Sequence, residues 1–453
     1  MTKPTEKKIY FIGIEGAGTS ALSVMYKNLG YEVLGSDDGD HFYADILKKN
    51  KIKTFKTYNE KNLPKKIYKV IYSTSIKDNN VEIIESKKRK LDIKSYPESL
   101  AELFNEKMGI AVCGTHGKTT ITAMLAFVAN KIGLNPKAIV GSKVINWGEN
   151  SLTGNGEYFI IEADEYQNKL KYYNPWSAIL TSVDYDHPDF YKTFKDYKRA
   201  FADFTKKIPK YGNLIYCNDD RDVSDVVSKA NCQKNSYGFM KDSNYRITNY
   251  KSIKQTLEVF YQKKSLGNFK IKLFGRHNAL NATAVIAFCH KLGMDISEVK
   301  KALALFKGTA RRFEKIGEKN GAILIDDYAH HPEEVKATLK TVKEIFPEKN
   351  IITVFHPHSF SRTERLLKDF ANSFSDTDEL IILDIYGSAR EDSGKVSSKN
   401  LVNLINKYSS KKARYISKIE KVTRELKNSI GKNDVIISMG AGNVWQVTHK
   451  LIK

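Results

Sequence analysis

The sequence Gly-Thr-His-Gly-Lys-Thr-Thr occupies residues 114–120, directly after an apolar run at 108–113. The apolar run has the length and residue types of a buried strand. Apolar residues then recur at the spacing of one helix face, at Ile121, Met124, Leu125 and Val128. Backbone N–H groups at the start of a helix, with a lysine and a hydroxyl beside them, suit nucleotide phosphates and their Mg²⁺. The stretch therefore predicts a strand, a phosphate-binding turn and a helix, although Val112 stands where the usual phosphate-loop pattern has its first glycine.

The composition indicates a globular protein of two to four domains. The chain has 453 residues, and 41% of them are hydrophobic and spread throughout. No apolar run approaches the roughly 18 to 20 residues that span a bilayer, and the N-terminus has no signal-peptide pattern, so we expect a cytoplasmic protein without membrane insertion. The cysteines have neither disulfide nor zinc spacing, and they stand at Cys113, Cys217, Cys232 and Cys289.

The formal charge of +22 comes mainly from lysines distributed along the whole chain. A nucleic-acid-binding surface usually has a clustered basic face. A solvated basic surface that also attracts anionic substrates is therefore the better interpretation, and we expect no nucleic-acid partner.

Residues 9–37 have the pattern strand, glycine turn, helix, strand. The turn is Gly13-Ile-Glu-Gly-Ala-Gly18, and Asp37 follows the second strand. In such a unit the helix N-terminus receives a pyrophosphate and the acidic residue meets a ribose. Because the glycine order is GxxGxG instead of GxGxxG, the turn alone leaves open a dinucleotide oxidoreductase, a protein for another nucleotide and a purely structural turn.

Acidic residues follow two expected strands of the second unit. The strand at 158–161 leads into Glu162, Asp164 and Glu165, and the strand at 178–183 leads into Asp184, Asp186 and His187. Carboxylates at the carboxyl ends of parallel strands, beside a phosphate loop, are well placed to hold Mg²⁺. Farther on, Asn278 and Asn281 lie one helical turn apart, so both amides can address one flat polar partner such as a base, with helix capping as the alternative for Asn278.

The third unit alternates strands with amphipathic helical segments, which predicts another doubly wound sheet. Polar clusters follow three of its expected strands at 326–332, 356–363 and 440–443, and indicate one binding edge. The overall prediction is an α/β protein of three domains. A Rossmann-like domain covers residues 1–105, a phosphate-loop ATPase-like parallel-sheet domain covers 106–308, and a C-terminal Rossmann-like domain covers 309–453.

Read together, these motifs resemble the Mur ligases, the ATP-dependent amide-forming enzymes of peptidoglycan precursor synthesis. The resemblance covers nearly the whole chain. It is carried by the Gly13 turn with Ser36-Asp37, GTHGKTT, EADE at 162–165, Asp186-His187, GRHNALNA at 275–282, ARRFE at 310–314, DDYAHHP at 326–332, HPHSFSRT at 356–363 and GAGN at 440–443. In that family the first domain binds the UDP moiety, the second binds ATP, and the third closes over the amino acid.

The resemblance implies that L-alanine is joined to the lactyl carboxylate of UDP-N-acetylmuramate through an acyl phosphate, with ATP and Mg²⁺ as cofactors. Lys118, His116, His187, Arg312 and His330 are then the catalytic candidates. ATP is expected to contact Gly114, Thr115, Gly117, Lys118, Thr119, Thr120, Asn278, Asn281, Arg312 and Asp327. The metal candidates are Thr119 and Glu162 for one ion and His187 for a second. The substrates are expected to contact Gly13, Gly16, Ala17, Gly18, Ser36 and Asp37 in the first domain, and Tyr328, His330 and Arg362 in the third.

Three departures from the family pattern stand out. Glu15 replaces a glycine and places a carboxylate near the expected pyrophosphate, which is unfavourable unless its side chain points away. Ser359 stands where some members carry arginine, which leaves Arg362 as the better carboxylate partner. Residues 199–204 contain no lysine, whereas the ligases for later amino acids use a carbamylated lysine in that region, so the alanine-adding branch is favoured.

Several alternatives stay open at this point. A ligase that joins a preformed tripeptide to UDP-N-acetylmuramate shares almost every motif, and Tyr166 slightly favours it, whereas the segment 356–363 favours alanine addition. An NAD-dependent oxidoreductase rests on the Gly13 turn and Asp37 alone. A nucleic-acid-stimulated NTPase rests on the charge and the phosphate loop. The sequence also leaves open glycine or serine as the amino acid, and whether the protein forms a homodimer.

Overall fold

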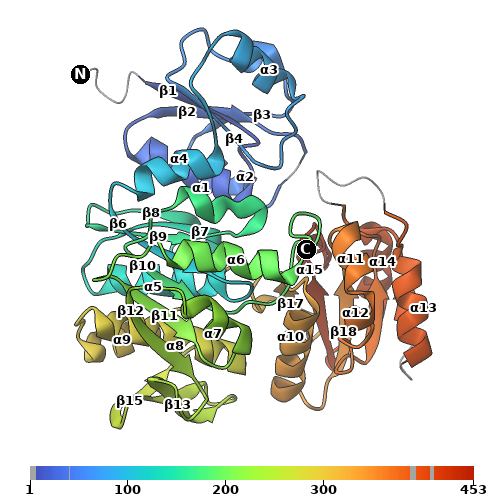
Figure 1. Ribbon diagram of the computed structural model, residues 1–453. Coiled ribbons are helices and arrows are strands. Elements are labelled where there is room, and N and C mark those ends of the chain that lie inside the picture. Colours follow the sequence, from blue (N-terminus) through green and yellow to red (C-terminus); the bar gives the residue numbers. More distant parts are fainter. Residues whose placement is uncertain (1–6, 40, 388–393, 409–412) are drawn as a thin grey trace.

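The computed structural model describes residues 7–39, 41–387, 394–408 and 413–453, and its strands form three sheets (Figure 1). The first sheet has the order β3-β2-β1-β4-β5, with all neighbours parallel. Its strands are β1 (Lys8–Ile12), β2 (Glu32–Ser36), β3 (Lys53–Phe55), β4 (Lys69–Tyr72) and β5 (Ile93–Ser95). The helical segments of this part are α1 (Ala17–Asn28), α2 (Ala44–Lys49), η2 (Glu60–Asn62), α3 (Val81–Lys88) and α4 (Tyr96–Phe104).

The second sheet is the largest and has the order β15-β14-β13-β12-β11-β10-β6-β9-β7-β8. The strands from β13 to β7 in this order are parallel, and β8, β14 and β15 are antiparallel additions at its ends. Its strands are β6 (Met108–Cys113), β7 (Lys137–Val144), β8 (Glu149–Thr153), β9 (Tyr158–Glu162), β10 (Ser177–Leu180), β11 (Asn213–Cys217), β12 (Gln233–Gly238), β13 (Tyr245–Lys251), β14 (Thr256–Tyr261) and β15 (Lys264–Lys270). The helical segments are α5 (Lys118–Lys131), η3 (Tyr166–Tyr172), α6 (Phe194–Thr205), α7 (Arg221–Val227), α8 (Arg276–Lys291) and α9 (Ile296–Leu303).

The third sheet has the order β16-β17-β21-β18-β19-β20, with only β16 antiparallel to its neighbour. Its strands are β16 (Glu314–Lys319), β17 (Ala322–Asp327), β18 (Asn350–Phe355), β19 (Glu379–Ile382), β20 (Ala413–Tyr415) and β21 (Asp434–Met439). Its helices are α10 (Pro332–Ile345), α11 (Phe360–Arg365), α12 (Leu367–Ala371), α13 (Ser398–Tyr408), α14 (Ile419–Ser429) and α15 (Trp445–Ile452). The strands that precede the three polar clusters, β17, β21 and β18, are neighbours in the sheet, as predicted.

Strand β6 shows why the apolar run 108–113 folds as it does. Ala111 and Cys113 belong to one hydrophobic cluster, and Ile110 and Val112 belong to another on the opposite face. A parallel strand that is covered on both faces has no reason to alternate apolar and polar residues. The strand expected at 178–183 ends earlier, at Leu180, because the backbone after it bonds to the phosphate loop instead of a ladder, as in Thr115 N–H to Ser182 O at 2.9 Å.

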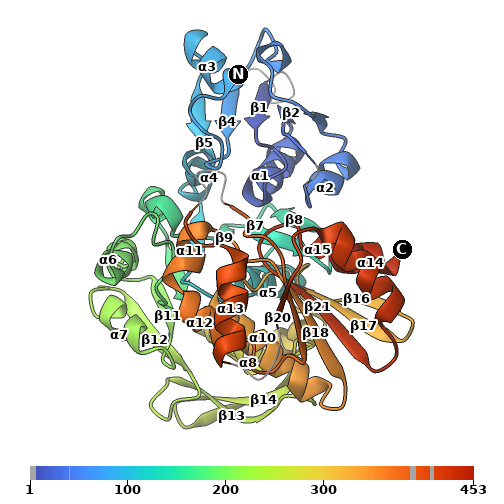
Figure 2. The same cartoon turned by 90° about the vertical axis from the view of Figure 1, so that its right-hand side faces the viewer.

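The first domain contacts both others. It lies at the top of Figure 1, above the second and third domains, which lie side by side; Figure 2 shows the same arrangement from the side. Asn150 in β8 donates to the carbonyl of Ala17 at 2.7 Å, and the Tyr43 hydroxyl donates to the carbonyl of Gly141 at 2.9 Å. Phe42 meets Trp445 of the third domain edge to face, with ring centroids 5.2 Å apart. Among the described helices, none is long and apolar enough to cross a bilayer.

A buried carboxylate in α3 joins several segments of the first domain through hydrogen bonds. Glu82 in α3 is fully buried and accepts hydrogen bonds from the Tyr10 hydroxyl at 3.0 Å, the Asn59 backbone at 3.0 Å and the Asn62 amide at 2.9 Å. It also accepts from the Ser36 hydroxyl. A buried carboxylate is tolerated only when such donors satisfy it.

We predict that Glu82→Ala lowers the free energy of unfolding by about 3 kcal/mol, because several buried donors lose their acceptor. Glu85→Ala on the same helix is the matched control, since Glu85 makes only a 3.7 Å pair with the exposed Lys88. Urea unfolding of both variants measures the effect. Equal stability of the two variants would contradict a structural role for the Glu82 network.

Candidate functional site

The phosphate loop joins β6 to α5 through two glycines with positive φ, Gly114 at 125° and Gly117 at 78°. These values lie in a region that other residues rarely adopt. Space is also limited, since a Cβ on Gly117 would lie 2.6 Å from Oδ1 of Asn281 in α8. The loop is therefore packed directly against the helix that carries the predicted base contacts.

Lys118 begins α5 and holds a positive charge inside the loop. Its Nζ donates to the carbonyls of Gly114 at 2.5 Å and Thr115 at 3.1 Å, and to Glu165 Oε2 at 2.9 Å. Burial disfavours the charge, but the nearby carboxylates, Glu165 foremost, outweigh it and raise the pKa of Lys118. The ammonium is thus charged at neutral pH, and the loop's own carbonyls and Glu165 hold it in place.

Glu162, at the end of β9, lies beside Thr119. The Thr119 hydroxyl donates to Glu162 Oε1 at 2.9 Å, and the Gly141 backbone donates to Oε2 at 2.7 Å. Burial raises the pKa of Glu162, although Lys118 and Arg312 act in the opposite direction. A buried carboxylate next to a hydroxyl is a donor set that fits a hard divalent cation, which would relieve the cost of the buried charge.

A second group of metal-type ligands lies close by. Asp164, Glu165 and His187 each offer a ligand atom within 4.8 Å of the others. Their contacts include His187 Nε2 to Glu165 Oε1 at 3.6 Å. His187 has a left-handed backbone, with φ of 54°. Thr119 and Glu162 thus lie together, and His187 lies beside Asp164 and Glu165, while a metal at either place stays a prediction.

His116 connects the loop to the third domain. Its Nδ1 lies 3.1 Å from Glu334 Oε1 in α10, and its Nε2 lies 2.9 Å from Asp184 Oδ2. Burial opposes a charged imidazole, but the bonds to Asp184 and Glu334 outweigh it and raise the pKa of His116 to about 10. Burial acts to raise the pKa of Glu334, but the neighbouring His330 and His116 outweigh it and hold that pKa well below its usual range. A charged histidine thus bridges two carboxylates across the domain boundary.

Arg312 reaches the phosphate loop from the third domain. Its Nη2 lies 3.4 Å from the Thr119 hydroxyl, and its guanidinium lies 5.1 Å from the ring centroid of Tyr328. Asp327, at the end of β17, accepts from the backbone of Phe313 and Ala329, both at 2.7 Å. Burial raises the pKa of Asp327 to about 6, even though Arg312 acts to lower it. The third domain thus contributes Arg312 and Asp327 to the surroundings of the phosphate loop.

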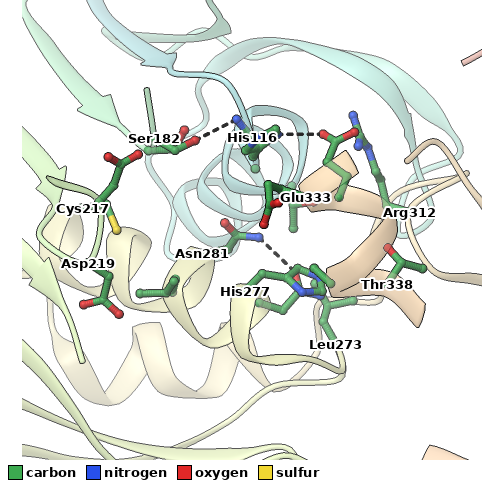
Figure 3. Close-up of a pocket in the computed structure, with 18 of the residues that line it drawn as sticks. His116, Ser182, Cys217, Asp219, Leu273, His277, Asn281, Arg312, Glu333 and Thr338 are labelled. Atoms are coloured by element: carbon green, nitrogen blue, oxygen red, sulfur yellow. Dashed lines mark hydrogen bonds and ion pairs between the residues drawn. The ribbon is translucent and has the colours of Figure 1, made fainter. Parts of the chain in front are cut away.

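A cavity of about 490 Å³ lies between the second and third domains (Figure 3). Figure 3 shows Cys217 and Asp219 at the left and Arg312 at the right, with His116 at the top centre and Asn281 and His277 below it. Most of the residues predicted to contact ATP line it, namely Gly117, Thr120, Asn278, Asn281, Arg312 and Asp327. Asn281 donates to Asn278 Oδ1 at 3.0 Å, and Asn278 donates to the carbonyl of Phe274 at 2.7 Å. Asn278 lies inside α8, whose N-cap is Gly275, so it does not cap the helix.

A second cavity of about 320 Å³ lies on the other side of the loop, where all three domains meet. The first domain contributes Gly16, Ala17 and Gly18 of its glycine turn. The second and third domains contribute residues that include Thr119, Glu162, Asp164, Lys169, Arg312 and Tyr328. Arg312 lines both cavities. The two spaces therefore adjoin at the phosphate loop.

Some predicted residues lie outside both cavities. Gly13 and Ser36 are buried in the first domain, and Asp37 accepts from the Glu15 backbone at 2.6 Å. Six other predicted residues also line neither cavity, namely Gly114, Thr115, Lys118, His187, His330 and Arg362. The Glu15 side chain points away from the cavity and pairs with Lys56 at 2.7 Å, which resolves the expected clash with a pyrophosphate. Ser359 caps α11.

Arg362, which is expected to bind the amino acid, forms a buried ion pair. Arg362 donates to Asp186 through Nε at 2.9 Å and Nη2 at 3.1 Å. Burial opposes the charge on Asp186, but Arg362 outweighs it and holds that pKa well below its usual range. His330 lies nearby, with its ring centroid 6.0 Å from that of His358. Its Nδ1 donates to the carbonyl of Tyr328 at 2.9 Å and lies 3.4 Å from Glu334 Oε2. Asp186 thus pairs with Arg362, while His187 Nε2 lies 3.7 Å from Asp186 Oδ2 and 3.6 Å from Glu165 Oε1.

Four residues of the site were not given an individual role from the sequence: Asp164, Glu165, Asp184 and Glu334. Asp164, Glu165 and Asp184 belong to the two acidic runs that were predicted as a whole to hold a metal ion. Glu334 is also the third residue of α10, where it accepts from the His331 backbone at 3.3 Å. A capping pattern explains that contact, but nothing local indicates its contact with His116.

Comparisons with known proteins identify the family. Residues 8–108 match the model of the Mur ligase family catalytic domain, 112–289 the Mur ligase middle domain, and 311–442 the Mur ligase glutamate ligase domain. The chain is 35% identical to a UDP-N-acetylmuramate–L-alanine ligase of Desulfitobacterium hafniense, over 98% of this chain and 99% of that protein. The chain belongs to the Mur ligase family.

Solved structures of Mur ligases share the arrangement. The UDP-N-acetylmuramate–alanine ligase of Thermotoga maritima superposes with a TM-score of 0.84 at 26% identity, covering 98% of each chain. A murein peptide ligase of Psychrobacter arcticus superposes with a TM-score of 0.77 at 22% identity, again over 98% of each chain, which shows the shared fold. Family membership favours ligation over the oxidoreductase and NTPase alternatives.

The His116 bridge predicts a pH-dependent contribution to stability. Because the folded protein raises the pKa of His116 from about 6.5 to about 10, the stabilisation is fully present below pH ~6.5 and is lost as the pH rises through about 10. We expect His116→Gln to melt well below the wild type at pH 6, with the gap narrowing towards pH 10. Thermal melts across this range measure it, and a constant gap would contradict a charged His116.

Proposed function

We propose that this Mur ligase joins L-alanine to the lactyl carboxylate of UDP-N-acetylmuramate at the expense of ATP, as a step of peptidoglycan precursor synthesis. The observation that carries the proposal is the meeting of two cavities at one phosphate loop. A nucleotide in the larger cavity and a sugar nucleotide in the three-domain cavity would approach each other there. That is the geometry that phosphoryl transfer from one to the other requires.

The first chemical step activates the carboxylate. A carboxylate oxygen attacks the γ-phosphorus of ATP, the bond to the β-phosphate oxygen breaks, and ADP and an acyl phosphate result. The protein supplies positioning and positive charge for such a transfer instead of a nucleophile. Arg312, which lines both cavities, and Lys118 of the loop would supply the positive charge, and charged His116 of the same loop lines the larger cavity.

The second step is attack by the amine. The neutral amine of L-alanine adds to the acyl carbon, and the tetrahedral intermediate loses a proton from nitrogen to solvent and expels phosphate to leave the amide. We assign the amino-acid pocket to Tyr328, His330 and Arg362. A guanidinium binds a carboxylate through two parallel hydrogen bonds. Arg362 already makes such a pair with Asp186, so the carboxylate of alanine would take the place of Asp186.

Mg²⁺ would be held by Thr119 and Glu162, and a second ion by His187 with Asp164 and Glu165. When bound, Mg²⁺ neutralises phosphate charge during transfer. The protein's part is to keep Glu162 oriented, which Thr119 and the Gly141 backbone do at 2.9 Å and 2.7 Å.

The proposal is tested by phosphate release from ATP with UDP-N-acetylmuramate and a panel of amino acceptors. We expect stimulation by L-alanine well above glycine, L-serine and the tripeptide L-alanyl-γ-D-glutamyl-meso-diaminopimelate. Release stimulated by the tripeptide but not by L-alanine would replace this proposal with the peptide-recycling reaction.

Lys118→Ala is expected to lower ligation at least about 100-fold, since it removes a charge that the transition state needs more than the ground state does. Lys131→Ala at the exposed end of the same helix is the control and should retain activity. Steady-state phosphate release measures both. Unchanged turnover of Lys118→Ala would count against the mechanism.

Glu162→Ala is expected to raise the Mg²⁺ concentration for half-maximal activity roughly tenfold or more, because loss of a carboxylate ligand weakens binding of a hard cation. Activity is titrated against Mg²⁺ at saturating ATP. If the titration curve of the variant overlies that of the wild type, Glu162 does not bind the metal.

A further inference from the structure

Lys169 has not been given a role, and it is buried in the three-domain cavity. Only 9% of the residue is exposed, and it lines the same space as the glycine turn of the first domain. Its Nζ donates to Asp164 Oδ2 at 2.5 Å and lies 5.4 Å from the ring centroid of Tyr166. Lysine is rarely buried without a reason, because its ammonium loses hydration.

An unusual backbone turns Lys169 into the cavity. Gln167 has φ of 57° and ψ of 25°, and Asn168 has φ of 54° and ψ of 38°, so two successive non-glycine residues are left-handed. This conformation is sterically costly and persists only where the surroundings fix it. Asp164 fixes it here, since its two oxygens accept from the Tyr166 backbone at 3.1 Å and from Lys169. Strain of this kind concentrates at binding sites.

A cation in this cavity would offset the negative charge of the carboxylates that line it. The carboxylates of Glu162 and Asp164 face it, whereas the sugar nucleotide that the proposed function requires carries a diphosphate and a lactyl carboxylate. Among the described residues that line this cavity, the basic ones are Lys169 and Arg312. Arg312 lines the larger cavity as well, so it is shared with the nucleotide side, whereas Lys169 lines only the three-domain cavity. Lys169 is the cation on the side of the sugar nucleotide.

We propose that Lys169 is a substrate-binding residue whose ammonium binds an anionic oxygen of the sugar nucleotide, either of its diphosphate or of its lactyl carboxylate. The inference rests on the proposed function. An ammonium has three N–H donors, and one is engaged by Asp164, which leaves two for an anion. Asp164 thereby acts as the group that holds the ammonium in place.

The test is calorimetric binding of UDP-N-acetylmuramate and of UDP-N-acetylglucosamine, which has the diphosphate but lacks the lactyl carboxylate. Lys169→Met removes the charge, and Lys169→Arg retains it. Lys171→Met is the matched control, because Lys171 lies on the same segment but is exposed. Binding of ATP and the melting temperature are measured on every variant.

We expect Lys169→Met to weaken binding of UDP-N-acetylmuramate about ten- to hundred-fold while the affinity for ATP changes by less than about twofold. Lys169→Arg should restore part of the lost affinity, and Lys171→Met should leave it unchanged. A similar loss for UDP-N-acetylglucosamine identifies the diphosphate as the partner, and a loss confined to UDP-N-acetylmuramate identifies the carboxylate.

Unchanged affinity of Lys169→Met for UDP-N-acetylmuramate would overturn the inference and leave the proposed function standing. An equal loss of ATP and sugar-nucleotide binding with a lower melting temperature would also overturn it, since Lys169 would then only support the fold. A wild-type protein that binds neither UDP-sugar would overturn the proposed function itself.

Discussion

The ion pair between Lys118 and Glu165 is the interaction around which the site is arranged. Glu165 is 1% exposed, and its Oε2 lies 2.9 Å from Lys118 Nζ, so each charge depends on the other. The pair fixes the ammonium inside the phosphate loop before any ligand arrives. It also places a carboxylate beside Asp164 and His187, so the cation of the loop and the ligands for a metal are positioned by the same contact.

The second domain alone would leave this site incomplete. Arg312 and Glu334 enter from the third domain, and the glycine turn of the first domain closes the other side. Charged His116 between Asp184 and Glu334 ties the loop to α10, and Phe42 against Trp445 ties the first domain to the third. A reaction that must exclude water from an acyl phosphate benefits from a site that exists only when all three domains are together.

Features with a local signal could be predicted from the sequence. The loop at 114–120, the acidic end of β9, the Asn278–Asn281 pair and the three polar strand ends each follow from spacing within one or two elements. The contacts between distant segments could not be predicted, because no local pattern encodes them: His116 meets Glu334 across 218 positions, and Arg362 meets Asp186 across 176. The left-handed turn at Gln167–Asn168 contains no glycine, the residue that usually indicates such a turn in a sequence. The position of Lys169 in the cavity therefore could not be predicted and is known only from the structure.

The central claim is that this site moves a phosphoryl group onto a carboxylate. The most direct measurement uses UDP-N-acetylmuramate in which both oxygens of the lactyl carboxylate are ¹⁸O. This substrate reacts with L-alanine and ATP, and the products are analysed by mass spectrometry. An acyl phosphate requires that the oxygen bonded to phosphorus leaves with it, so we predict one ¹⁸O in each phosphate released during ligation. Release of AMP that carries ¹⁸O, or of phosphate without any ¹⁸O, would contradict the account.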